Sequence, residues 1–124
     1  MVQLILHLIG DYVTQTDWMA KRKTQSSVAA GCHALVYSLP FLLLKPSWIA
    51  LAVIAGTHFL IDRFRLARFV VFAKNWVTNP SLQWAEASGT GYSKDTPDWL
   101  AVWLLIITDN TLHLTINYAA LRWL

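Results

Sequence analysis

The sequence predicts an all-α integral membrane protein: a four-helix bundle with an interfacial segment between the third and fourth helices. Three observations support this fold class. Hydrophobic residues make up 56% of the 124 residues and charged residues only 14%, whereas soluble domains carry about 25% charged residues. Apolar stretches recur along the chain at lengths that suit a bilayer. Basic residues gather at the ends of these stretches, as they do beside membrane helices. We expect residues 1–124 to form a single transmembrane helical domain.

The first expected helix covers about residues 1–20 and has one polar stripe. The stripe residues recur every four positions, which places them on one helical face; they are Gln3, His7, Asp11 and Gln15. Gly10 beside them would let another helix approach closely. No basic region precedes the apolar stretch, so we expect this segment to be retained rather than cleaved. The polar loop KRKTQSS follows, and Ser26 or Ser27 can cap the next helix.

The second and third expected helices are more uniformly apolar. The second covers about residues 26–44 and contains Pro40, which can kink a membrane helix when neighbours satisfy the freed carbonyl group. The third begins near Ser47, stays apolar to Ile61, and continues as the basic amphipathic stretch DRFRLARFVVFAKNW. These two helices are expected to be joined by a short turn.

Residues 75–97 are expected to lie along the membrane interface. They are rich in helix-breaking residues and include Trp76 and Trp84, whose amphipathic rings favour the headgroup region. The fourth helix is expected to start at Asp98, because a proline and an acidic residue in the first turn favour helix initiation. It then continues to Leu124.

The distribution of charge predicts a multi-pass protein of a bacterial inner (cytoplasmic) membrane. The net charge of +3 and the pI of 9.3 could suggest a nucleic-acid partner. However, the basic residues cluster at residues 21–23 and 63–74, beside apolar segments, and no basic and aromatic platform is present. We therefore expect no nucleic-acid partner. The lone cysteine, Cys32, excludes an internal disulfide and a CxxC-type zinc site.

Histidine and aspartate are distributed in an unusual pattern. All four histidines lie in apolar stretches, and three of them have a carboxylate four residues away on the same helical face. The pairs are His7 with Asp11, His58 with Asp62, and Asp109 with His113, while His33 stands alone on the second helix. A buried carboxylate costs several kcal/mol, about 2 or more, unless it has a partner or a function.

Imidazole and carboxylate groups together predict a divalent metal site. They suit zinc, manganese, iron or nickel, and we expect zinc or manganese. The predicted ligands are His7, Asp11, His33, His58, Asp62, Asp109 and His113. This set exceeds one tetrahedral site, so either two ions bind or some carboxylates orient imidazoles. The predicted catalytic groups are Asp11, Asp62 and Asp109, of which a carboxylate that does not bind metal could be the general base.

The expected substrate is lipid-like and contains a phosphate or carboxylic ester. Arg63 and Arg65 could bind a phosphate, although their position favours a role as cytoplasmic anchors. Gln15 and Asn110 are expected nearby as hydrogen-bonding groups. These features favour a membrane-embedded metal-dependent hydrolase. The alternatives are a metal-binding or proton- or ion-conducting membrane protein, a phage-type membrane effector that binds a host partner, and a purely structural bundle. A homo-oligomer is compatible with all of them.

Three motifs resemble those of a known family. HLIGDYVTQ, THFLIDRFR and TDNTLH are similar to motifs of small bacterial and phage membrane proteins catalogued as domain of unknown function 3307, which open with HLxxDfxxQ. The resemblance covers nearly the whole chain and implies a membrane location but no activity. The His- and Asp-bearing helices are also distantly similar to YdjM-like membrane-bound hydrolases. That similarity implies metal-dependent hydrolysis.

Overall fold

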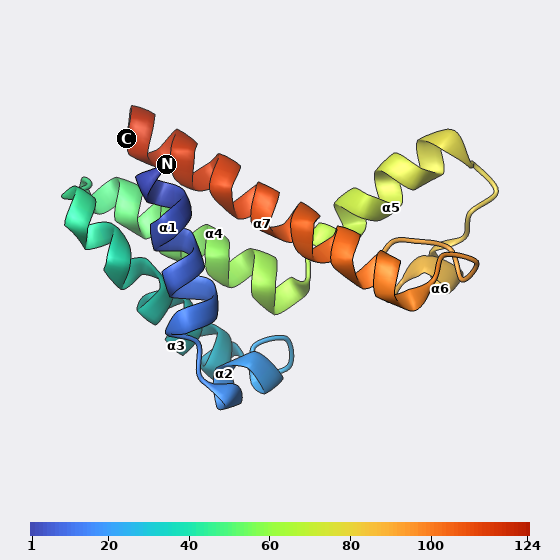
Figure 1. Ribbon diagram of the computed structural model, residues 1–124, viewed down its shortest axis with the longest axis horizontal. Helices are drawn as coiled ribbons and strands as arrows, with labels where there is room; N and C mark the ends of the chain where they lie inside the picture. Colours follow the sequence, from blue (N-terminus) through green and yellow to red (C-terminus); the bar gives the residue numbers. More distant parts are fainter. The chain divides into compact units, whose positions relative to one another are not determined.

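A computed structural model describes all residues 1–124 (Figure 1). The protein is all-α, as predicted, but it contains more and shorter helices than four. In chain order the elements are α1 (Val2–Leu8), the π-helical η1 (Ile9–Val13), α2 (Asp17–Arg22), α3 (Ser27–Ser38), the 3-10 helix η2 (Leu39–Leu44), α4 (Trp48–Phe64), α5 (Ala67–Thr78), α6 (Trp84–Ala87) and α7 (Asp98–Trp123).

The segment expected as one helix over residues 1–20 is interrupted. After α1 the chain adopts the π-helical turn η1, in which the Thr14 hydroxyl donates to the Gly10 carbonyl over 3.0 Å. Thr16 is extended, and its hydroxyl accepts from the backbone N–H of Met19 over 3.3 Å. A threonine at the N-cap favours a new helix start, so α2 begins as a separate element.

The second expected helix is an α-helix over most of its length and a 3-10 helix at its end. Ser26 caps α3 by accepting from the Ala29 N–H over 3.4 Å, which confirms one of the two expected caps. Pro40 cannot donate a backbone hydrogen bond, and the chain tightens there into η2. Lys45, with a φ of 50°, is left-handed and ends the segment.

The third expected helix is divided in two. Arg65 has a φ of 53°, a left-handed conformation that a continuous α-helix cannot contain. It separates α4 from α5. The following breaker-rich residues 75–97 contain only the end of α5 and the four-residue α6. Helix α7 begins at Asp98, as expected.

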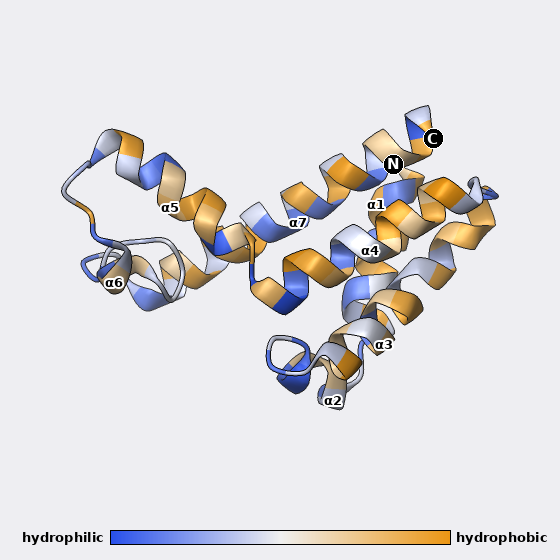
Figure 2. Ribbon diagram, turned by 180° about the vertical axis from the view of Figure 1, so that it is seen from behind, coloured by the Kyte–Doolittle hydropathy of each residue, from blue (hydrophilic) through white to orange (hydrophobic).

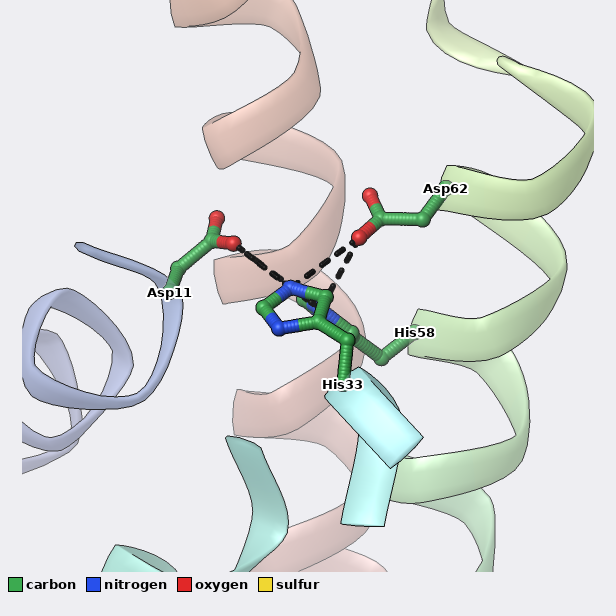
Figure 3. A group of neighbouring side chains, drawn as sticks. All are labelled: Asp11, His33, His58 and Asp62. Atoms are coloured by element: carbon green, nitrogen blue, oxygen red, sulfur yellow. Dashed lines mark hydrogen bonds and ion pairs between the residues drawn. The ribbon is translucent and has the colours of Figure 1, made fainter. Parts of the chain in front are cut away.

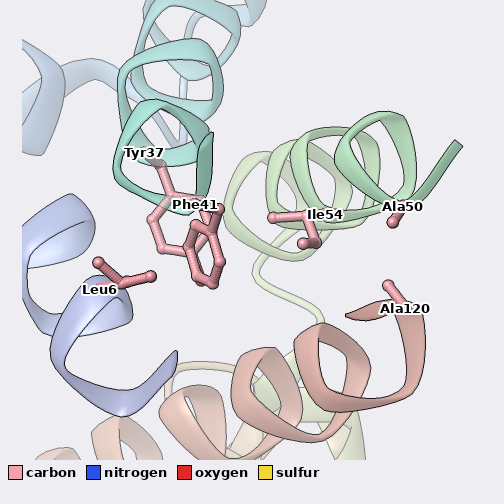
Figure 4. Packing of buried hydrophobic residues seen from close by; sticks show 6 residues of the cluster. All are labelled: Leu6, Tyr37, Phe41, Ala50, Ile54 and Ala120. Carbon is pink, nitrogen blue, oxygen red and sulfur yellow. The ribbon is translucent and has the colours of Figure 1, made fainter. Parts of the chain in front are cut away.

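The chain forms two compact units. The first comprises residues 1–64 and 113–124, so it contains α1 to α4 and the C-terminal part of α7. Its hydrophobic core joins residues from five helical segments, α1, α3, η2, α4 and α7 (Figure 4), namely Leu6, Tyr37, Phe41, Ala50, Ile54 and Ala120. The predicted single transmembrane domain stays a prediction.

The second unit comprises residues 65–112. An arginine links its helices: the Arg68 guanidinium donates to the Ser88 carbonyl over 2.9 Å and lies 5.4 Å from the Trp84 ring centroid. The Trp84 ring also stacks on Phe69, with 4.7 Å between centroids. Asn75 donates to the Gly91 carbonyl over 2.9 Å, which fixes the loop after α6 against α5.

Large hydrophobic side chains are abundant on the surface, and several polar side chains are buried. Two segments, Ser27–Leu44 and Asp98–Trp123, are long and apolar enough to cross a membrane. Figure 2 shows that α4 is also hydrophobic along most of its length. Leu43, Trp48 and Trp99 are among many exposed large hydrophobic residues, while all four histidines are buried.

Candidate metal centre

Five buried polar residues from separate segments of the first unit meet beside its hydrophobic core. Each segment is apolar around the polar side chains that it contributes. Each of these residues is no more than 6% exposed. The residues are Asp11 on η1, His33 on α3, His58 and Asp62 on α4, and His113 on α7. Their burial together in the interior makes this the candidate functional site.

Four of these residues form a compact set that we call the aspartate–histidine group: Asp11, His33, His58 and Asp62 (Figure 3). Their ligand atoms all lie within 4.8 Å of one another. The Nε2 atom of His33 lies at the centre, 3.1 Å from Asp11 Oδ1, 3.2 Å from Asp62 Oδ2 and 3.0 Å from His58 Nε2. One ring nitrogen carries at most one proton, so a single N–H cannot serve all three neighbours well.

A lysine also contacts this group, although the sequence pattern did not predict it. The ammonium Nζ of Lys23 lies 2.8 Å from Asp62 Oδ2, 3.5 Å from Asp11 Oδ1 and 3.3 Å from His33 Nε2. Its side chain is only 19% exposed. The sequence pattern KRK indicated a cytoplasmic flank, and nothing in it distinguished Lys23 from the exposed Lys21.

Asp62 connects the aspartate–histidine group to His113. Its second oxygen, Oδ1, lies 3.5 Å from His113 Nε2. The Nδ1 atom of His113 lies 3.2 Å from His58 Nδ1. Three histidines are therefore linked in the order His33, His58, His113, and Asp62 lies within 3.5 Å of all three.

His7 contacts Tyr37 and lies near His113, with 5.8 Å between the two imidazole centroids. Asn117 Nδ2 donates to the Tyr37 hydroxyl over 2.6 Å, and that hydroxyl lies 2.8 Å from His7 Nδ1. Neither Tyr37 nor Asn117 was among the site residues predicted from the sequence. A signal existed, because each stands four residues after a selected histidine, His33 or His113, and so shares its helical face.

The π-helical turn explains why His7 and Asp11 point to different neighbours. Their spacing of four residues would place them one above the other on an α-helix. The π-helix closes i→i+5 hydrogen bonds instead, so the α-helical spacing rule does not hold between His7 in α1 and Asp11 in η1. Asp11 thereby reaches His33, while His7 reaches Tyr37.

The other predicted site residues have individual placements. Arg63 is bound to the backbone of the first unit, because its Nη1 donates to the Thr24 carbonyl over 2.9 Å. Arg65 belongs to the second unit and donates to the Gly89 carbonyl over 2.8 Å. The Oε1 atom of Gln15 is buried without a hydrogen-bond partner. Asp109 and Asn110 belong to the part of α7 in the second unit, and their roles stay predictions.

The chemistry of the aspartate–histidine group fits a divalent ion. Two carboxylates and two imidazoles provide oxygen and nitrogen ligands of the kind that zinc and manganese bind. The neighbouring His113 and Lys23 supply a proton acceptor and a positive charge within 4 Å of the ligands. Such a site could hold one ion and bind or activate an anionic or polarisable ligand.

The chain belongs to the family described as "Protein of unknown function (DUF3307)", whose model matches residues 1–121. This match confirms the family resemblance found in the sequence motifs. Searches of curated proteins and of solved structures found no match.

Proposed function

We propose that the protein is a multi-pass membrane protein that binds a divalent metal ion in the aspartate–histidine group and uses it to hydrolyse an ester. The substrate class is a lipid-like molecule with a phosphate or carboxylic ester. The observation that supports this proposal most strongly is the convergence of four buried ligand atoms, from three separate segments, within 4.8 Å of one another.

The charge of the group supports a metal ion. Asp11 and Asp62 are 5% and 6% exposed. A carboxylate oxygen of each lies close to His33 Nε2, at 3.1 Å for Asp11 and 3.2 Å for Asp62. Removing two carboxylates from water costs several kcal/mol each, about 2 or more, unless positive charge lies beside them. A divalent ion would balance both carboxylates and would accept both imidazoles as neutral ligands. Zinc or manganese suits this mixture.

The distribution of hydrophobic residues supports a membrane location. A soluble protein rarely exposes contiguous large apolar surface, yet this one exposes Leu43 near the end of η2 and both Trp48 and Ile49 at the start of α4. Its interior contains buried histidine and aspartate beside the hydrophobic core. We propose a bacterial inner-membrane bundle of four crossings, formed by the segment containing α1 and η1, by α3 with η2, by α4, and by α7. The basic ends of α2 and α4 would face the cytoplasm.

The proposed reaction follows from the neighbours of the group. A bound ion lowers the pKa of coordinated water to about 7 and polarises an ester or phosphoryl oxygen. Asp62 would face the ion through Oδ2, while its Oδ1 lies 3.5 Å from His113 Nε2. This arrangement would let Asp62 and His113 act as the proton-accepting pair during attack of the water.

Metal analysis of the detergent-purified protein tests the proposal. We expect close to one equivalent of zinc or manganese in the wild type, and its loss in Asp11→Asn and His58→Ala. Thr57→Ala is a matched control, because Thr57 precedes His58 on α4 and its hydroxyl donates only to carbonyl groups of its own helix. Wild-type protein that binds neither metal after reconstitution would overturn the metal centre.

The hydrolysis itself needs a separate test. Metal-loaded protein in mixed micelles would be incubated with chromogenic phosphate esters and carboxylic esters that bear an acyl chain. We expect turnover of one class by the wild type and Thr57→Ala, and none by Asp62→Asn. Metal binding without turnover of either class would leave a metal-binding protein and refute the hydrolase.

One observation favours a second candidate function, proton conduction. The ring nitrogens of His33, His58 and His113 follow one another at 3.0 and 3.2 Å, and such chains of imidazoles can relay protons across membranes. Proteoliposomes with an enclosed pH-sensitive dye distinguish the two functions. Proton flux that persists with a chelator and disappears in His58→Ala would support conduction in place of metal-dependent hydrolysis.

A further inference from the structure

Lys23 contacts the same atoms that would bind the metal ion. Its ammonium lies 2.8 Å from Asp62 Oδ2, 3.5 Å from Asp11 Oδ1 and 3.3 Å from His33 Nε2. These three atoms belong to three of the four residues of the aspartate–histidine group, and each is of a kind that binds metal ions. An ammonium group donates hydrogen bonds and accepts none, so it meets the two carboxylates as a metal cation would.

We propose that the Lys23 ammonium and the divalent ion compete for one cation position, so that Lys23 sets the metal affinity of the centre. The inference rests on the metal binding proposed above and adds a residue that determines it. Lys23 supplies the positive charge that the two buried carboxylates need whenever the ion is not bound. Binding of the ion then requires the ammonium to leave.

The charges explain why both cations are not held together. The two carboxylates supply two negative charges, which a divalent ion alone neutralises. An ammonium at hydrogen-bond distance from the same oxygens would lie beside the ion with only those oxygens between them. Repulsion between like charges is strong where water is excluded, and the Asp62 side chain is only 4% exposed.

The local structure lets the side chain leave while its backbone stays in place. Lys23 is the C-cap of α2, at the start of the turn that leads to Ser26. Arg63 holds this turn by donating to the Thr24 carbonyl over 2.9 Å and to the Ser27 hydroxyl over 3.2 Å. A lysine has a flexible four-carbon stem, and its partial exposure of 19% gives the ammonium a path to solvent.

Two variants with unbranched side chains separate the charge of Lys23 from the length of its stem. Lys23→Met removes the competing cation and keeps the stem, whereas Lys23→Arg keeps the charge. Lys21→Met is the matched control, because Lys21 lies two residues earlier, is exposed, and pairs only with the exposed Asp17. Zinc and manganese titrations of the full-length protein in detergent would compare the four proteins.

We expect Lys23→Met to bind zinc at least tenfold more tightly than the wild type, while Lys23→Arg and Lys21→Met do not gain affinity. Wild-type binding with no gain in Lys23→Met would overturn the competition and leave the metal centre intact. Absence of binding in both proteins would instead refute the metal centre itself.

Chemical labelling of the wild-type protein tests the displacement without any substitution. Amine acylation followed by mass spectrometry reports the reactivity of each lysine, with the exposed Lys21 as internal reference. We expect added zinc chloride to raise the acylation rate of Lys23 at least tenfold and to leave that of Lys21 unchanged. A Lys23 rate that zinc does not raise, in protein that binds zinc, would overturn the inference.

Discussion

The ring of Tyr37 stacks on the imidazole of His58, with 3.6 Å between the ring centroids and 12° between the ring planes. Tyr37 is fully buried, and its hydroxyl is the hydrogen-bond partner of both His7 and Asn117. It therefore joins the hydrophobic core of the first unit to the candidate metal centre. Its ring orients a predicted ligand, and its hydroxyl satisfies two buried polar groups.

Removal of this hydroxyl should destabilise the first unit and spare the metal centre. Tyr37→Phe keeps the stacked ring but leaves His7 Nδ1 and Asn117 Nδ2 without that partner, and a buried unsatisfied polar group costs about 1–3 kcal/mol. Equilibrium unfolding in mixed micelles would measure the loss. Tyr118→Phe is the control, because Tyr118 is 53% exposed. An unchanged free energy of unfolding in Tyr37→Phe would contradict the role of the hydroxyl.

Gly10 should be the glycine at which the first unit tolerates a side chain least. A Cβ atom there would lie 2.7 Å from the Tyr37 carbonyl oxygen and 2.9 Å from its ring, and neither the backbone of α3 nor the stacked ring can yield easily. We expect Gly10→Ala to destabilise the unit by about 1–3 kcal/mol. Gly31→Ala on α3 is the matched control, because nothing lies within 4 Å of its added Cβ atom. Equal unfolding free energies for the two variants would contradict the close approach.

Part of the aspartate–histidine group and this close approach could be predicted from the sequence for one physical reason. Helical spacing fixes which side chains share a face, so His58 and Asp62 could be paired on α4, and Gly10 could be recognised as a point of helix contact. The separation of His7 from Asp11 could not be predicted, because it depends on the π-helical turn η1. No residue of that segment distinguishes a π-helix from an α-helix by composition.

Contacts between residues that are far apart in the sequence could not be predicted either. Lys23 enters the aspartate–histidine group because the turn after α2 folds back, and Arg63 holds that turn across 39 residues of sequence. The end of α4 at Phe64 depends on the left-handed Arg65, a conformation that the arginine itself disfavours. Tertiary contacts decide both features, so a pattern of apolar and basic residues gave only continuous helices and basic flanks.

Gly91 should be essential to the second unit. Its φ of +86° is a conformation that residues with a Cβ atom rarely adopt, and an added Cβ atom would also collide with the Arg68 carbonyl and lie 2.7 Å from the Phe72 nitrogen. We expect Gly91→Ala to cost about 1–3 kcal/mol. Gly89→Ala has open space around its Cβ atom and serves as the control. Limited proteolysis of the α5–α6 region would report the change, and equal cleavage rates in both variants would contradict it.

The proposed membrane topology predicts which side of the membrane each loop faces. If α3 with η2 crosses outwards and α4 crosses back, the loops before and after this pair face the cytoplasm and the turn between them faces the outside. The Ser27–Leu44 segment has 18 residues, which at about 1.5 Å per residue approaches the thickness of the hydrocarbon core. Lys21 in α2, Lys45 in the turn after η2 and Lys74 in α5 are exposed, and they mark the three regions before, between and after the two crossings.

Single cysteines at these positions, in a Cys32→Ser background, test that topology in intact cells and in inverted membrane vesicles. A membrane-impermeant maleimide should label Lys45→Cys from outside, and Lys21→Cys and Lys74→Cys only in inverted vesicles. Positions 21 and 74 on opposite sides would mean an odd number of crossings between them and would refute the four-crossing bundle. Position 45 on the same side as 21 would show that α3 enters the membrane without crossing it. The metal centre would survive that second result, because Asp11, His33 and Asp62 meet through contacts within the first unit alone.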